Sequence, residues 1–154
     1  MANADSVSQL YSDSFGNFCV ARAQTLSLTS TGNAVLSIPI LNGGLTAGGA
    51  VANSGSVIIR RITIQNPSAN ISAANIAVTI SPTGNVATAN AVTANTVLSN
   101  LTVVGTWQDI AIANNFASNT AVSGNSTQAL YINVNTAVAN ATFDIRVYGD
   151  VVTF

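Results

Sequence analysis

The sequence predicts an all-β protein, folded as an antiparallel sandwich of two sheets with about eight strands and a jelly-roll topology. Apolar residues recur at every second position, which is the spacing of a strand that buries one face. Val and Ile are enriched in these runs, and turn sequences such as Asn42-Gly43-Gly44 and Ser81-Pro82-Thr83-Gly84 separate them. No stretch has both the apolar spacing and the capping residues of an amphipathic helix.

The first four expected strands come before or at the Pro-containing turn. The third contains VIIRRITIQ, a β-branched run interrupted by two arginines. Two others contain apolar residues that alternate with small or polar ones, namely Leu36/Ile38/Ile40 and Ile76/Val78/Ile80. In chain order, we expect these strands over residues 24–29, 34–41, 56–65 and 75–81.

The last four strands are expected over residues 96–104, 107–113, 128–135 and 141–152. Two of them contain the alternating sets Leu130/Ile132/Val134 and Phe143/Ile145/Val147. We expect these two sets, together with Ile76/Val78/Ile80, to form the core. Their neighbours Asn133, Asn135 and Asp144 are then expected to face solvent or a partner, because successive side chains of a strand point to opposite faces.

The chain of 154 residues is expected to form one sandwich domain, 1–154, in which residues 1–20 are an extended N-terminal arm. The segment 42–55 is rich in Gly and Ala and is expected to be a long loop. Cys19 is the only cysteine, which excludes an intramolecular disulfide, and we interpret it as a small core residue.

Composition argues against most enzyme chemistry. The chain has no Lys, no Glu and no His, and only 6% of its residues are charged. A histidine general base, a histidine-ligated zinc and a lysine Schiff base are therefore excluded. We expect a protein that is not an enzyme and that uses no cofactor and no metal. A surface of Asn, Thr, Ser and Gln also lacks the charge repulsion that keeps monomers apart, so self-association is expected.

Two other partner classes are unsupported by the sequence. The formal net charge is −1 and the four arginines form no basic stripe, so nucleic acid is not an expected partner. No apolar run approaches the length of a membrane span, so a membrane is not an expected partner either.

Asn recurs every five residues over much of the segment 69–103, at positions 70, 75, 85, 90, 95 and 100. This spacing resembles that of pentapeptide repeats, which build a square β-helix. The central position of each pentad lacks the large residues that would fill such a helix, and seven pentads are few for a stable stack. We therefore favour two strands with an Asn-rich connection and keep the β-helix as the alternative.

Arg60 and Arg61 are the most informative polar pair, because they lie inside an apolar strand. Adjacent strand residues point to opposite faces, so one guanidinium is expected to be buried and paired with Asp109, Asp144 or Asp150. The alternative is that one is solvated and the other reaches solvent at a sheet edge.

Four further residues are candidates for an interface. Asp144 and Arg146 lie two apart on one strand face, which favours an ordinary surface pair, and Tyr148 continues that face. Trp107 is interpreted as an aromatic packed on the sheet. A sugar-stacking platform formed by Trp107 with Tyr131 or Tyr148 is the alternative.

Three stretches together resemble small virion proteins of tailed bacteriophages. They are ITIQNPSANISAANIAVTISPTG, VLSNLTVVGTWQDIAIA and ALYINVNTAVANATFDIRVYGDVV. The resemblance is to capsid decoration, or cement, proteins, in particular those of phages that infect cyanobacteria. It spans roughly residues 56–152 and rests on the sequences of the expected strands and on composition, not on a signature motif.

The resemblance implies a β-sandwich or jelly roll, self-association as a homotrimer, and attachment between major capsid proteins on the outer surface of the virion. Synthesis in the cytoplasm of the host bacterium follows from it, and the family has no catalytic residues to carry over. Two alternatives stay open: a tail, baseplate or fibre component, and a carbohydrate-binding sandwich. The roles of segment 42–55 and of the pentads in 69–103 are not assigned by the resemblance.

Overall fold

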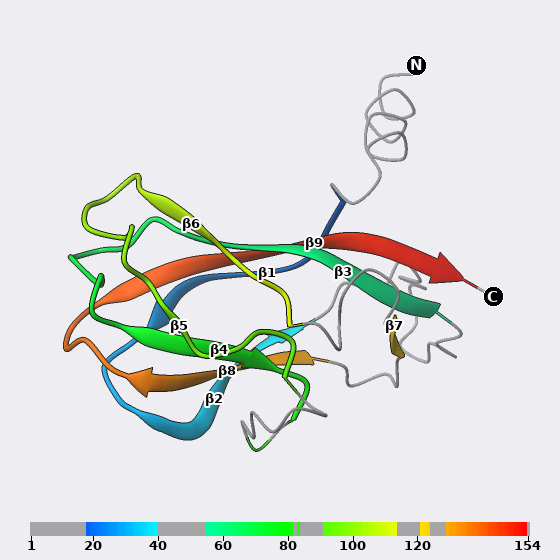
Figure 1. Ribbon diagram of the computed structural model, residues 1–154, viewed down its shortest axis with the longest axis horizontal. Coiled ribbons are helices and arrows are strands. Elements are labelled where there is room, and N and C mark those ends of the chain that lie inside the picture. Colours follow the sequence, from blue (N-terminus) through cyan, green and yellow to red (C-terminus); the bar gives the residue numbers. More distant parts are fainter. Residues whose placement is uncertain are drawn as a thin grey trace, which may run out of the picture.

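The computed structural model describes residues 18–39, 55–81, 83, 91–113, 121–123 and 129–153. These residues form strands, turns and extended segments and contain no helix. The strands make two antiparallel sheets that lie one above the other (Figure 1). The prediction of an all-β protein with two antiparallel sheets is therefore confirmed.

Sheet A has the strand order β1-β9-β3-β6, with β7 pairing with β3 beyond β6. Sheet B has the order β2-β8-β4-β5. The bounds in sheet A are β1 (Phe18–Ser27), β9 (Thr142–Thr153), β3 (Gly55–Gln65), β6 (Trp107–Ile110) and β7 (Ala121–Ser123). Those in sheet B are β2 (Gly32–Pro39), β8 (Ala129–Thr136), β4 (Asn75–Thr79) and β5 (Thr96–Val97).

All eight expected strands have a counterpart, but two details differ. The strand expected over 96–104 is only Thr96–Val97, because the chain then turns: Leu101 N donates to Leu98 O at 2.9 Å and Thr106 N donates to Val103 O at 3.1 Å. Both leucines are fully buried, so the apolar pattern there marks anchored turns. The short strand β7 was not predicted.

Phe18–Val20, which we expected to belong to an N-terminal arm, is part of β1. Residues 1–17 lie outside the described residues, as does most of the segment 42–55. The square β-helix is contradicted for the described part of the Asn-rich segment. There β4 pairs antiparallel with β8 and β5, whereas a β-helix stacks its turns in parallel.

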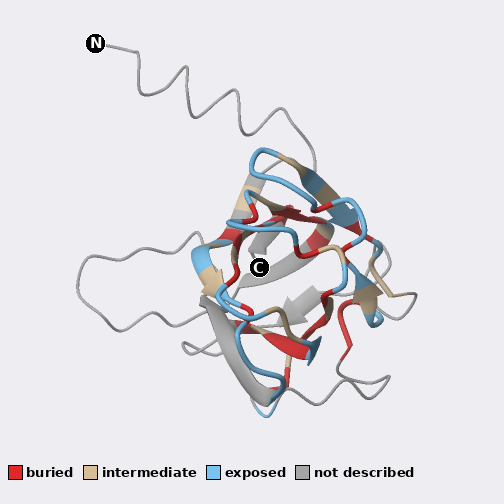
Figure 2. Cartoon of the chain, turned by 90° about the vertical axis from the view of Figure 1, so that its left-hand side faces the viewer, coloured by how far each residue is buried: buried red, intermediate tan, exposed pale blue. Residues whose placement is uncertain are grey.

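The core lies between the sheets and is formed by the residues expected to point inward. Of the nine predicted core residues, Ile80 is partly buried against the core and the others are buried. Ile62, Ile64 and Ala21 add to it from β3 and β1. Figure 2 shows buried segments inside and exposed residues on the surrounding loops.

One outward residue departs from the prediction. Asn135 is exposed as expected, but Asn133 is only 6% exposed. Its neighbours Ile132 and Val134 point into the core, so Asn133 lies on the outer face of sheet B. Its partner Ala77 and the nearby Thr79 are also buried. This part of the outer face is therefore covered, and strict alternation of buried and exposed residues fails on β4 and β8.

One edge of the sandwich is closed by main-chain hydrogen bonds. Val92 N and Thr93 N both donate to Val78 O of β4, at 2.8 and 3.0 Å. On the other side of this segment Ala113 N donates to Val92 O at 2.8 Å, just beyond the end of β6. The segment thus joins sheet B to the continuation of sheet A.

Phe143 is the largest fully buried side chain among the described residues, so its truncation should cause a large loss of stability. The variant Phe143→Ala should lower the free energy of unfolding by about 3–5 kcal/mol, because it removes apolar contacts and leaves a cavity. The control Asn135→Ala, at an exposed position of β8, should change it by no more than about 0.5 kcal/mol. Urea unfolding followed by circular dichroism measures both, and equal midpoints would contradict the placement of the core.

Candidate interaction surface

The register of sheet A brings six of the seven candidate interface residues to one face. Cross-strand neighbours share a face, and the face opposite the core carries three rows. Across β1, β9, β3 and β6 these rows are Cys19–Tyr148–Arg61, then Arg22–Arg146–Thr63–Asp109, then Asp144–Gln65–Trp107. Sequence reasoning placed these residues on separate strands, and the pairing makes them neighbours.

A β-bulge resolves the conflict posed by two arginines inside an apolar strand. Ile59 pairs with Gly149 and Arg61 pairs with Tyr148, so Arg60 is the extra residue of the bulge. Ile59 and Ile62, three positions apart, are both buried, which strict alternation does not allow. The extra residue of the bulge shifts this alternation by one position, so both isoleucines can face the core. As a result Arg61 is exposed and Arg60 is half-buried.

Arg61 stacks on an aromatic ring. Its guanidinium carbon lies 4.4 Å from the centroid of the Tyr148 ring, within the range of a cation–π contact. Arg146, two residues before Tyr148 on β9, is also exposed, and a hydrogen bond with the Tyr148 side chain raises its pKa. Tyr148 therefore contacts two arginines. We call the four residues Arg22, Arg61, Arg146 and Tyr148 the arginine face.

Asp144 is held by both neighbouring strands. Thr25 N of β1 donates to its Oδ1 at 2.9 Å, and Asn66 Nδ2, just after β3, donates to its Oδ2 at 3.0 Å. Thr25 and Asn66 have φ of 56° and 52°, a left-handed conformation that is unusual for a β-branched residue such as Thr25. The carboxylate thus holds two irregular backbone positions on either side of β9.

The other two predicted aspartates have different surroundings. Asp109 is exposed and its Oδ1 accepts a hydrogen bond of 2.5 Å from Thr63 Oγ1. Asp150 lies on β9 opposite Ile58, and its side chain lies outside the described residues. These hydrogen bonds of Asp109 and Asp144 therefore come from Thr and Asn side chains and from backbone.

Charge is distributed very unevenly between the sheets. All four arginines of the chain lie on β1, β3 and β9 of sheet A. The four strands of sheet B contain no charged residue. In a chain with so few charges, this concentration makes sheet A the charged sheet and leaves the strands of sheet B neutral.

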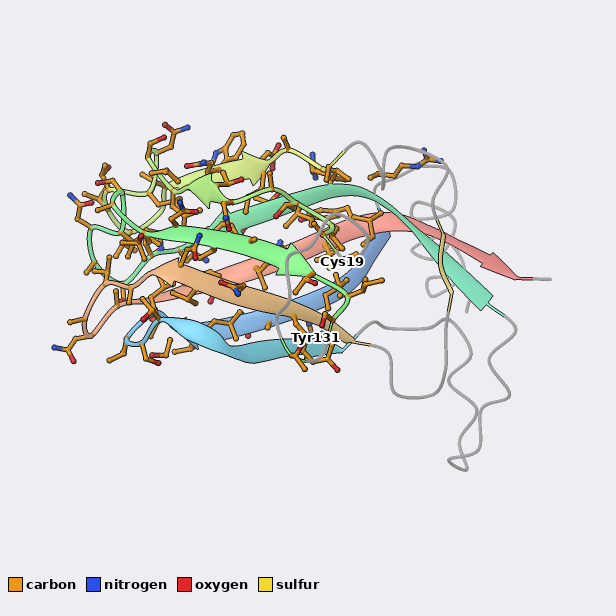
Figure 3. The ribbon with its side chains drawn as sticks, turned by 60° about the horizontal axis from the view of Figure 1, so that its bottom comes forward. Cys19 and Tyr131 are labelled. Atoms are coloured by element: carbon orange, nitrogen blue, oxygen red, sulfur yellow. The ribbon has the colours of Figure 1, made fainter. Side chains whose placement is uncertain are left out.

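The aromatic residues considered for sugar stacking do not form one platform. Tyr131 comes from β8 of sheet B, whereas Tyr148 and Trp107 belong to sheet A; Figure 3 labels Tyr131 together with Cys19 of β1. The Tyr148 ring already carries Arg61 on one side. Cys19, which we expected to be a core residue, is instead half-buried beside Tyr148 on the outer face.

Trp107 belongs to a second surface feature. Among the described residues, the exposed large apolar side chains are Val97, Val103, Val104 and Trp107, with Trp107 62% and Val104 72% exposed. We call these four residues the apolar tip. Trp107 is thus largely exposed at the start of β6.

The apolar tip has a fixed conformation. Gln108 Nε2 donates to Val97 O at 2.9 Å and its Oε1 accepts from Asn100 N at 3.0 Å. Thr106 Oγ1 donates to Val103 O at 2.6 Å, and Asn66 N donates to Thr106 O at 3.2 Å. Sequence reasoning missed Gln108, Thr25, Asn66 and Arg22, because no local pattern of residues indicates the contacts that give them their roles.

The part of the chain that the structure describes contains no group of three or more His, Cys, Asp or Glu side chains that could hold a metal ion. Within the same residues, no helix is long and apolar enough to cross a membrane. Comparisons with protein-family models, curated proteins and solved structures find no match to the chain.

The contacts of Asp144 can be tested by exchanging partners. The variant Asp144→Asn keeps an oxygen for Thr25 N but places an amide against the Asn66 amide, so it should lose about 1 kcal/mol of unfolding free energy. The double variant Asp144→Asn with Asn66→Asp restores a donor opposite an acceptor. It should therefore recover most of that loss in urea unfolding. A double variant no more stable than the sum of its single variants would contradict the contact.

Proposed function

We propose that this protein is a non-enzymatic virion component that decorates the outer surface of a bacteriophage capsid and holds major capsid proteins together. The strand order supports this proposal best. If β7 is set aside, the first of eight strands pairs with the last (β1–β9), the second with the seventh (β2–β8), the third with the sixth (β3–β6) and the fourth with the fifth (β4–β5). This nested pairing is that of a jelly roll, which is the topology that we propose.

Jelly rolls occur in viral capsid and lectin domains, so the fold alone leaves two classes open. The separation of Tyr131 from Trp107 and the contact of Arg61 with Tyr148 favour the capsid role, because a sugar platform needs free aromatic faces on one surface. The resemblance to decoration proteins over residues 56–152 favours the same class. Synthesis in the host cytoplasm and attachment to the outer capsid surface follow from the proposal.

The apolar tip supports self-association. Residues 62–108 contain no charged side chain, and the four exposed apolar residues lie within this span. Two copies can therefore bring their tips together without like-charge repulsion, and Trp is frequent among the residues that dominate interface energies. We propose that the tips meet around a three-fold axis, which closes on itself and fits the three-fold junctions of an icosahedral shell.

The proposed trimer makes a prediction for mass in solution. Light scattering should give three times the chain mass of 15.6 kDa for the wild type. The variant Val104→Asp places a charge in the apolar tip and should reduce the mass to that of one chain. The matched control Asn135→Asp adds the same charge to exposed β8 and should stay trimeric. A wild-type monomer, or a trimer in all three proteins, would contradict the role of the tip.

The capsid role predicts that the protein binds capsid shells and that each virion contains many copies of it. The purified protein should sediment with capsid shells assembled without it. In complete virions its copy number should approach that of the major capsid protein, because decoration sites recur across the lattice. A few copies per particle would indicate a tail, baseplate or fibre component. Failure to sediment with the shells, together with binding on a glycan array, would indicate a carbohydrate-binding protein.

A further inference from the structure

We infer that the arginine face is the surface that docks on the capsid, and that its partner is a protein surface that presents carboxylates. This inference rests on the proposed function and names the contact through which it is carried out. It starts from the pairing of Arg22 on β1 with Arg146 on β9. Both side chains are exposed and they are directly opposite each other on the same face.

Like charges at directly opposed positions destabilise a sheet. Arg61 lies one row away on the third strand and adds another exposed guanidinium. Three of the chain's four arginines thus gather in two adjacent rows, although sheet B offers strands that carry no charge. An anionic partner placed against the guanidinium groups replaces this repulsion with attraction. Binding of such a partner therefore explains why the arginines are clustered.

The nearby aspartates offset the positive charge of the cluster only in part, and their oxygens are already bound to other groups. Asp144, on the same face of β9, uses both oxygens to bind Thr25 N and Asn66 Nδ2. Asp109 lies at the far end of the Arg22–Arg146–Thr63 row and accepts from Thr63 Oγ1. Asp144 still attracts Arg146, but it is the last of the causes that raise the pKa of that arginine. Outward guanidinium donors therefore remain for a partner.

The shape and composition of the face favour a protein. It lies on three adjacent strands of sheet A, and Tyr148 contacts both Arg61 and Arg146. Arg and Tyr are enriched among the residues that dominate protein interfaces. A guanidinium group can also form two parallel hydrogen bonds with a carboxylate, so the contact is directional as well as electrostatic. The bulge at Arg60 and the contact with Tyr148 hold Arg61 in place before binding.

The test uses capsid shells assembled without this protein as the probe, and the full-length chain in wild-type and variant forms. Arg22→Gln and Arg146→Gln should each weaken binding about tenfold, and the double variant more, because charge-assisted hydrogen bonds to carboxylates are lost. The control Asn135→Asp changes the net charge by the same amount as one of these variants but lies on sheet B. It should bind as the wild type does. Circular dichroism and urea unfolding verify that every variant is folded.

The chemistry of the partner is tested on the shells. Conversion of their surface carboxylates to amides should abolish binding of the wild type, whereas acetylation of their lysines should not. Arg146→Lys should retain part of the affinity, since it keeps the charge without the paired hydrogen bonds.

Each contrary result has a distinct meaning. Wild-type protein that does not bind untreated shells would overturn the proposed function together with this inference. Equal binding by the wild type and the double arginine variant would overturn the inference alone, as would full binding to amidated shells. Binding to duplex DNA that is lost in the same arginine variants would assign the face to phosphates, and the carboxylate partner would be wrong.

Discussion

The pairing of β9 along both of its edges is the constraint on which the rest of the structure depends. This strand lies between β1 and β3, and its residues alternate between two tasks. Phe143, Ile145 and Val147 point inward and fill the core, while Asp144, Arg146 and Tyr148 point outward. One register therefore sets the core and the outer face together. A shift by one residue would bury charge and expose the core at once.

The bulges show how a strand with mixed residue types keeps this register. In β3 the extra residue Arg60 lets Ile59 and Ile62 both reach the core. In β1 irregular pairing occurs between Cys19 and Ala21 and again between Ala23 and Leu26. The second irregularity contains Thr25, whose amide binds Asp144. The bulges thus keep β1 and β3 in register with β9, and the contact of Thr25 with Asp144 stabilises the irregular part of β1.

Much of the fold could be predicted from the sequence, because alternation of apolar residues is a local signal. The sets Leu130/Ile132/Val134 and Phe143/Ile145/Val147 were enough to place strands and core. The bulge at Arg60 could not be predicted, since it depends on which strand pairs with β3. The burial of Asn133 depends likewise on what covers sheet B. The candidate residues were found one by one, but their gathering on one face required the order β1-β9-β3-β6.

The two edges of the sandwich should differ in how easily they open, because main-chain hydrogen bonds between the sheets close one of them. Main-chain bonds join β4, the segment 91–93 and residues 112–113, so separating the sheets there requires breaking several of them together. Among the described strands, β1 and β2 are outermost in their sheets on the other side, and each pairs along one edge. Local fluctuations should therefore begin at β1 and β2, and their amide hydrogens should exchange with solvent before those of β4. The arginine face includes both kinds of strand, because Arg22 lies on the outermost strand β1 while Arg146 and Arg61 lie on the inner strands β9 and β3.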